Sequence, residues 1–133
     1  MIGIILTGHG TFASAMAGAA KLLVGEAPIV DIDYQGEDTA SFEAKLDGEL
    51  NRFPADIPVL VLCDLLGGTP FRLAATRAQG RKNVRVIYGT NLNMLVEACM
   101  CSFEEQAPAV DDLAASVTAL GKDQIGVLNT GTV

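Results

Sequence analysis

A single histidine and a distant aspartate are the side chains of this sequence whose neighbours best suit them to chemistry. His9 lies between two glycines, and Asp64 directly follows an apolar segment and precedes a glycine pair. A carboxylate that accepts a hydrogen bond from one imidazole nitrogen fixes the tautomer and leaves the lone pair of the other nitrogen facing outward. An imidazole held in this way is suited to accept a phosphoryl group on nitrogen.

Glycines and hydroxyl groups beside both residues favour an anion site. Backbone N–H groups at helix N-termini and in glycine-rich loops point outward and attract phosphate oxygens. Threonine hydroxyls add further hydrogen-bond donors. The candidate phosphate-binding residues are therefore Gly10, Thr11, Gly67, Gly68 and Thr69.

Each of these residues also has a plainer interpretation, and their types alone do not choose between the two. A lone histidine is often structural, and Asp64 could cap its own loop or the following helix. A glycine pair could be only a tight turn. Asp31 and Asp33, which alternate with apolar residues, fit a solvated strand face.

Other kinds of site are disfavoured by what the sequence lacks. It has no GxxxxGK[ST] loop for nucleotide phosphates, and no serine or cysteine in a GxSxG turn. No acidic cluster of the kind that binds Mg²⁺ follows the first predicted strand. A metal site would need a second histidine or a tight acidic cluster, so we expect no metal and no cofactor.

Composition indicates one domain, 1–133, with an acidic surface. The chain is 50% apolar, which suffices for one core, and its formal net charge of −7 disfavours a nucleic-acid partner. The longest apolar run, Ile57–Cys63, is far shorter than the roughly 18 residues of a membrane-spanning helix. The N-terminus has no basic segment typical of a signal peptide, and the three cysteines are an odd number. We therefore expect a cytoplasmic protein with reduced thiols.

Strand and helix patterns alternate along the chain, with apolar runs for strands and 3.6-residue periodicity for helices. A helix capped by Thr69, with Pro70 at its first position, is expected to run to about Gln79. A last helix should begin near Asp111 and Asp112 and end at Gly121. The expected strands are Gly3–Thr7, Val30–Tyr34, Val59–Leu62, Val84–Tyr88 and a short final Ile125–Leu128. The other expected helices run from Thr11 to before Gly25, along a stripe from Phe42 to Phe53, and over Leu92–Met100.

This alternation predicts an α/β fold with a doubly wound, mostly parallel sheet of order 2-1-3-4, as in flavodoxin-like proteins. The acidic alternation of the second strand places it at an edge. In such a sheet the crevice lies between the carboxyl ends of strands 1 and 3, where the winding reverses. His9 and Asp64 should therefore meet there. The open apolar edge of strand 4 predicts a homodimer that covers it.

Three segments, GIILTGHGTFASAM, VLCDLLGGTPFRLAA and YGTNLNMLVEA, resemble the enzyme IIA domain of the mannose-type sugar phosphotransferase system, which serves mannose, fructose, sorbose and N-acetylgalactosamine. The likeness covers essentially the whole chain. It implies that His9 accepts a phosphoryl group from the phosphocarrier protein HPr and passes it to the IIB protein of a sugar permease, with the membrane components IIC and IID reached only indirectly. It also implies that Asp64 orients His9 and that Thr69 supplies the hydroxyl found before a Pro-Phe pair.

The resemblance further implies a homodimer in which an antiparallel C-terminal strand, here Ile125–Leu128, is exchanged between subunits. Some members continue into a IIB domain, whereas this chain stops at Val133 and so resembles a free-standing IIA. Two alternatives stay open. One is the phosphotransfer subunit of a phosphoenolpyruvate-dependent dihydroxyacetone kinase, against which the intact DLLGGTPF and GTNLNMLVE segments count. The other is a non-catalytic flavodoxin-like binding module, which the lack of aromatic residues in the crevice loops disfavours.

Overall fold

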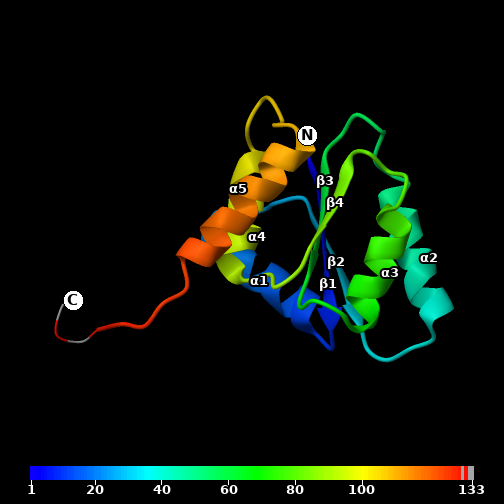
Figure 1. Ribbon diagram of the computed structural model, residues 1–133, viewed down its shortest axis with the longest axis horizontal. Helices are drawn as coiled ribbons and strands as arrows, with labels where there is room; N and C mark the ends of the chain where they lie inside the picture. Colours follow the sequence, from blue (N-terminus) through cyan, green and yellow to red (C-terminus); the bar gives the residue numbers. More distant parts are fainter. Residues whose placement is uncertain (130, 132–133) are drawn as a thin grey trace.

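The computed structural model describes residues 1–129 and 131, so Val133 lies outside the described residues, and its strands and helices alternate as predicted (Figure 1). The strands are β1 (Gly3–His9), β2 (Ile29–Tyr34), β3 (Val59–Cys63) and β4 (Val84–Ile87). The helices are α1 (Phe12–Val24), α2 (Thr39–Leu50), α3 (Gly68–Ala78), α4 (Leu92–Ser102) and α5 (Val110–Asp123).

The four strands form one sheet of order β2-β1-β3-β4, and all three pairings are parallel. This confirms the predicted flavodoxin-like α/β fold. β1 and β3 are the central strands, and both consist almost entirely of buried residues. A strand that is covered on both faces reads as a continuous apolar run, which is why these two were evident in the sequence.

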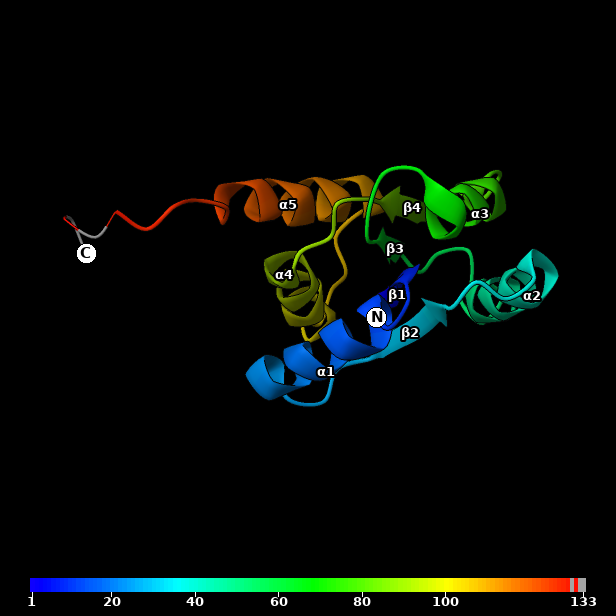
Figure 2. The same cartoon turned by 90° about the horizontal axis from the view of Figure 1, so that it is seen from below.

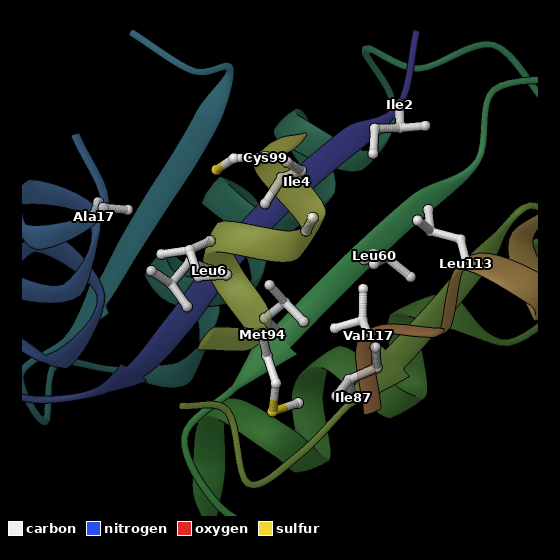
Figure 3. Close-up of a cluster of buried hydrophobic side chains, with 14 of the residues drawn as sticks. Ile2, Ile4, Leu6, Ala17, Leu60, Ile87, Met94, Cys99, Leu113 and Val117 are labelled. Atoms are coloured by element: carbon white, nitrogen blue, oxygen red, sulfur yellow. The ribbon is translucent and has the colours of Figure 1, made fainter. Parts of the chain in front are cut away.

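Helices cover both faces of the sheet: Figure 2 shows α1, α4 and α5 on one side and α2 and α3 on the other. Side chains alternate across each strand, so Ile4 and Leu6 face the first group of helices while Ile5 faces the second. The core on the first side is the larger of the two. It gathers residues of β1, β3 and β4 with those of the three helices, as Figure 3 shows for Leu60, Ile87, Met94, Leu113 and Val117.

The prediction that Thr69 caps α3 is wrong. The helix begins at Gly68, and its N-cap is Gly67, which has no side chain to donate or accept. Gly67 and Gly68 both have positive φ values, 85° and 77°, and so turn the chain into the helix before Thr69 is reached. Thr69 therefore lies inside the first turn, and Pro70 stands at the third helical position rather than the first.

The prediction that Gly121 ends the last helix is also wrong. α5 continues to Asp123, and Gly121 is buried within it. A Cβ atom at this position would collide with the Met94 side chain of α4. Gly121 therefore allows α4 and α5 to pack closely. In the sequence alone, a glycine needed for close packing cannot be distinguished from a glycine that ends a helix.

The C-terminal segment Ile125–Leu128 forms no strand in the described part of the chain. It leaves the end of α5 and extends away from the body of the molecule (Figure 1). Its apolar side chains are exposed, Val127 by 97% and Leu128 by 70%. A single copy of the chain thus leaves this predicted strand without a neighbour to pair with.

Candidate functional site

Strand register brings His9 and Asp64 together at the carboxyl end of the sheet. The pairing of β1 with β3 aligns Thr7 with Cys63, so Asp64, the next residue, arrives level with the end of β1. β1 continues to His9, two residues beyond its predicted end, because β2 pairs with it as far as Tyr34. The juxtaposition that the topology predicts is therefore present.

Asp64 holds His9 by two hydrogen bonds to one carboxylate oxygen. The His9 ring nitrogen Nδ1 lies 2.7 Å from Asp64 Oδ2, and the His9 backbone N–H donates to the same oxygen at 2.9 Å. The other oxygen, Oδ1, accepts the backbone N–H of Leu65 at 2.9 Å. Asp64 therefore does cap its own loop, as the plainer interpretation had it, and contacts the histidine as well.

The charge of Asp64 determines where the His9 proton resides. Burial alone would raise the pKa of Asp64, but hydrogen bonds from the His9 backbone and ring and from Leu65 outweigh burial and lower it. An ionised carboxylate can only accept, so Nδ1 of a neutral His9 must carry the proton and Nε2 must carry the lone pair. The His9 side chain is 47% exposed and that of Asp64 only 10%. Nε2, the nitrogen with the lone pair, is thus on the more exposed of the two side chains.

The close contact between the two loops depends on Gly8. A Cβ atom there would lie 2.6 Å from Cδ1 of Phe12 and 2.9 Å from Cβ and Cγ of Asp64. Any larger residue would push Asp64 away from β1 or displace the start of α1. The glycine before His9 thus allows the carboxylate to approach the strand that carries the histidine.

The N-terminus of α3 lies against the free edge of the imidazole. A Cβ atom built on Gly68 would be 2.8 Å from Cε1 and 3.1 Å from Nε2 of His9. The first turn of α3 is therefore adjacent to the nitrogen that the Asp64 contact leaves unprotonated. The positive end of the α3 dipole and its first N–H groups face the same space, which suits an anion on Nε2.

The first loop offers fewer donors than its sequence suggests. The Gly10 backbone N–H already donates to the Tyr34 carbonyl at 2.7 Å. Thr11 precedes α1 as its N-cap without a capping hydrogen bond from its side chain. Of the five candidate phosphate-binding residues, Gly67, Gly68 and Thr69 are those at the start of α3.

Residues 3–117 match the EIIA-man family, described as the PTS system fructose IIA component. The chain belongs to this family. It is 30% identical to the fructose-specific EIIA component of Bacillus subtilis over 96% of this chain and 86% of that protein. It is 31% identical to the mannose-specific EIIAB component of Escherichia coli K12 over 99% of this chain, but spans only 41% of that protein.

Solved structures agree with this assignment to the mannose/fructose-type IIA components of the phosphotransferase system. The EIIA component of Streptococcus agalactiae matches with a TM-score of 0.83 and 31% identity over the whole of both chains. The mannose/sorbose-specific IIA subunit of Enterococcus faecalis matches with a TM-score of 0.81 and 30% identity, over 96% of this chain and 95% of that one. The resemblance found in the sequence is thereby confirmed.

Contacts of two residues near the site were missed in the sequence. Asp33, expected on a solvated face, accepts the Ser14 N–H at 2.9 Å and the Ser14 hydroxyl at 2.6 Å, and so caps the first turn of α1. The neighbouring Tyr34 ring meets the His9 ring edge-on, with centroids 6.2 Å apart. Both lie at the carboxyl end of β2, and that position was the available signal. Asp31 is exposed as expected.

A thiol beside the site does not compete with the histidine as nucleophile. Cys63 directly precedes Asp64, and burial, with a smaller contribution from the Asp64 charge, raises the pKa of its thiol to about 12. The thiol stays protonated near neutral pH, and the thiolate is the nucleophilic form. Cys63 is also fully buried in β3.

Residues 1–129 and 131 contain neither a cluster of side chains that could hold a metal ion nor a helix that could cross a membrane. No group of three or more histidine, cysteine, aspartate or glutamate side chains there is arranged to hold a metal ion. No helix in this part of the chain has both the length and the apolar character needed to cross a membrane.

Proposed function

We propose that this IIA component is a phosphoryl carrier in which His9 Nε2 accepts a phosphoryl group from phosphorylated HPr and passes it to the IIB protein of a mannose-type sugar permease. The observation that carries the proposal is the hydrogen bond between Nδ1 and Asp64, which leaves Nε2 exposed beside α3. The membrane components IIC and IID are reached only through IIB. We place this exchange between proteins in the cytoplasm.

The transfer requires no proton to leave His9. The Nε2 lone pair forms the new bond to phosphorus, and the bond from phosphorus to the donor atom of HPr breaks with its electron pair remaining on that atom. Nδ1 keeps its proton throughout, and its bond to the Asp64 carboxylate stabilises the positive charge that the ring gains as it attacks. Asp64 is thus the orienting residue and His9 the nucleophile.

The start of α3 binds the phosphoryl oxygens in this proposal. The backbone N–H groups of Gly67, Gly68 and Thr69 precede or begin the helix, and the Thr69 hydroxyl lies in the same turn. Because charge spreads over the phosphoryl oxygens during transfer, donors that are already aligned lower the barrier. Gly10 and the Thr11 hydroxyl contribute from the opposite loop if the Gly10–Tyr34 hydrogen bond opens.

Labelling with phosphoenolpyruvate, enzyme I and HPr tests the proposal. We expect one phosphate per chain, in a linkage that is labile to acid and stable to base, because His9 is the only imidazole in the sequence. His9→Ala should abolish labelling without loss of the circular dichroism of the fold. Retained labelling in that variant would contradict the proposal, and onward transfer to a IIB protein separates it from a role with dihydroxyacetone kinase.

The exposed tail supports a homodimer in which Ile125–Leu128 pairs antiparallel with the partner. Among the described residues β4 pairs with β3 alone, and a groove of about 470 Å³ opens between β4 and α5, lined by Val86, Tyr88 and Ala114 among others. An open apolar strand edge tends to be covered by another strand. The apolar tail residues have the composition to do so.

Removal of the chain from Ile125 onward tests this arrangement and leaves α5 whole, since the helix ends at Asp123. We expect the truncated protein to dissociate or aggregate in sedimentation measurements at micromolar concentration, because β4 loses its cover. A full-length protein that sediments as a monomer under the same conditions would count against the dimer.

A further inference from the structure

Arg72 shares one face of α3 with the residues that begin this helix beside His9. It follows Gly68 by four residues and Thr69 by three, and residues at these spacings share one face of a helix. Helical side chains lean toward the N-terminus, so a long side chain covers the turn that precedes it. Arg72 is therefore directed over the turn that contacts Nε2 of His9.

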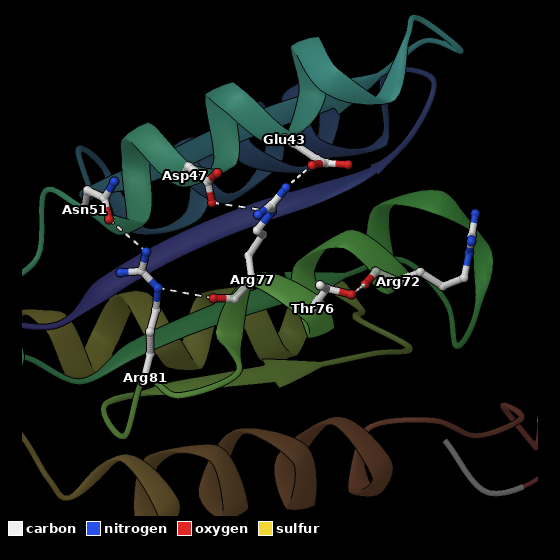
Figure 4. Close-up of polar contacts among 7 residues, drawn as sticks. All are labelled: Glu43, Asp47, Asn51, Arg72, Thr76, Arg77 and Arg81. Carbon is white, nitrogen blue, oxygen red and sulfur yellow. Dashed lines mark hydrogen bonds and ion pairs between the residues drawn. The ribbon is translucent and has the colours of Figure 1, made fainter.

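The contact that the Arg72 side chain makes agrees with a direction toward the start of α3. Its Nη2 lies 3.4 Å from the Thr69 hydroxyl oxygen, at the start of the helix. Figure 4 shows the side chain running away from Arg77 and from the acidic residues of α2. No carboxylate pairs with Arg72 in the described part of the chain, whereas Arg52, Arg77 and Arg85 each pair with at least one.

The start of α3 lacks one donor that a phosphoryl group would use. Pro70 stands at the third helical position and has no N–H, so one of the outward-facing amides of the first turn is missing. The Asp64 carboxylate binds Nδ1 on the other side of the same ring, and the chain as a whole carries a net charge of −7. A phosphoryl group on Nε2 adds further negative charge that a nearby cation would offset.

We propose that Arg72 is a phosphoryl-binding residue, whose guanidinium donates to the oxygens of the group carried on His9 Nε2 while Thr69 holds it at the helix start. This inference rests on the proposed carrier function. The planar guanidinium with its five N–H donors matches a phosphoryl face better than an ammonium group does. The bonds made and broken are those of the transfer itself, and Arg72 neither gains nor loses a proton.

Phosphorylation by two different donors tests the role of Arg72. Arg72→Ala and Arg72→Lys are compared with wild type and with Arg52→Ala, which removes the same charge beside α2. The donors are phosphorylated HPr and the small molecule phosphoramidate. We expect Arg72→Ala to slow uptake from both by about 10- to 100-fold, the effect of losing a charged hydrogen bond, with Arg72→Lys intermediate and Arg52→Ala within about twofold of wild type.

The titration of the bound phosphoryl group gives a second readout that a structural role would not move. In ³¹P spectra of the phosphorylated protein, loss of a neighbouring cation should shift the phosphoryl titration to higher pH in Arg72→Ala but not in Arg52→Ala. Wild-type rates and titration in Arg72→Ala would overturn the assignment of Arg72 and leave the carrier function intact. Slowing with HPr alone would overturn it too, since Arg72 would then contact the partner protein. If wild type takes no phosphate from either donor, the carrier function itself fails.

Discussion

Two of the charged contacts between elements that lie far apart in the sequence, one at Arg77 and one at His9, are built in opposite ways. Arg77 of α3 reaches across to α2, where it pairs with Glu43 and lies 3.6 Å from an oxygen of Asp47 (Figure 4). His9 and Asp64 join the ends of β1 and β3. Both contacts tie two elements together, so a charged contact between distant elements does not by itself identify a reactive group.

The difference lies in what each contact leaves unused. The Arg77 guanidinium stands between two carboxylates of α2, and its Nε, which makes no hydrogen bond to the described residues, is buried in the contact between α2 and α3. The His9 ring is bound at Nδ1, while at Nε2 it has no hydrogen bond to residues 1–129 or 131 and stays about half exposed. A contact prepares a group for chemistry when it immobilises one side and leaves the other free.

Asp64→Asn is expected to have the largest effect of the substitutions that probe this difference. The amide keeps the shape but loses the charge, and it can donate to the wrong ring nitrogen. Loss of the aspartate in a hydrolase triad costs about 10⁴-fold in rate; here no separate hydroxyl must be deprotonated, so we expect about 10- to 10³-fold slower transfer from phospho-HPr.

Asp47→Asn, in the Arg77 contact, is the matched control for Asp64→Asn. It should transfer at the wild-type rate, and circular dichroism should show both variants folded. Transfer at the wild-type rate in Asp64→Asn would mean that Asp64 acts only as a loop cap, and the contrast between the two contacts would disappear.

Gly68→Ala probes the side of the His9 ring that carries Nε2. The new methyl group would lie 2.8 Å from Cε1 and 3.1 Å from Nε2 of His9 and would displace the ring or the helix start. Displacements of this size in reacting groups cost up to about 10²-fold, so we expect transfer to slow by about 10- to 100-fold.

Gly80→Ala separates this crowding from backbone strain. Gly80 follows the other end of α3 with a φ of 80°, close to the 77° of Gly68, and a Cβ atom there meets nothing within 4 Å. Both variants should lose about 1 kcal/mol of stability to the left-handed backbone conformation. If phosphoryl transfer falls equally in both, strain rather than contact with His9 is responsible.

Apolar periodicity and strand ends were enough to predict the sheet order and the meeting of His9 with Asp64. Both follow from topology, because parallel strands put their carboxyl ends at one edge and the winding reverses at a known place. The family resemblance and the fold led to the same pair of residues. Neither depended on the details of side-chain packing.

The errors came from glycines and from contacts between elements. Gly121 resembles a helix stop because a glycine that relieves crowding against Met94 looks the same in sequence as one that adopts positive φ. Thr69 resembles a helix cap because the capping rule does not anticipate that Gly67 and Gly68 turn the chain first. Asp33 looks solvated in the sequence because its partner, Ser14, lies 19 residues away in the chain.

Arg77→Met should have the smallest effect on transfer and a visible effect on stability. The substitution keeps most of the apolar stem but leaves Glu43 and Asp47, four residues apart on α2, as unneutralised like charges. Because the Arg77 side chain is 34% exposed and that of Glu43 26%, solvent screens the contact, and we expect a loss of about 1 kcal/mol in the free energy of unfolding. Urea denaturation measures this loss, and adding Glu43→Gln should restore part of it by removing the repulsion.

Transfer from phospho-HPr to Arg77→Met should stay within about twofold of wild type, since α3 keeps its start beside His9 when its contact with α2 is weakened. A fall in transfer comparable to that of Asp64→Asn would show instead that the α2–α3 contact also positions the reactive end of α3.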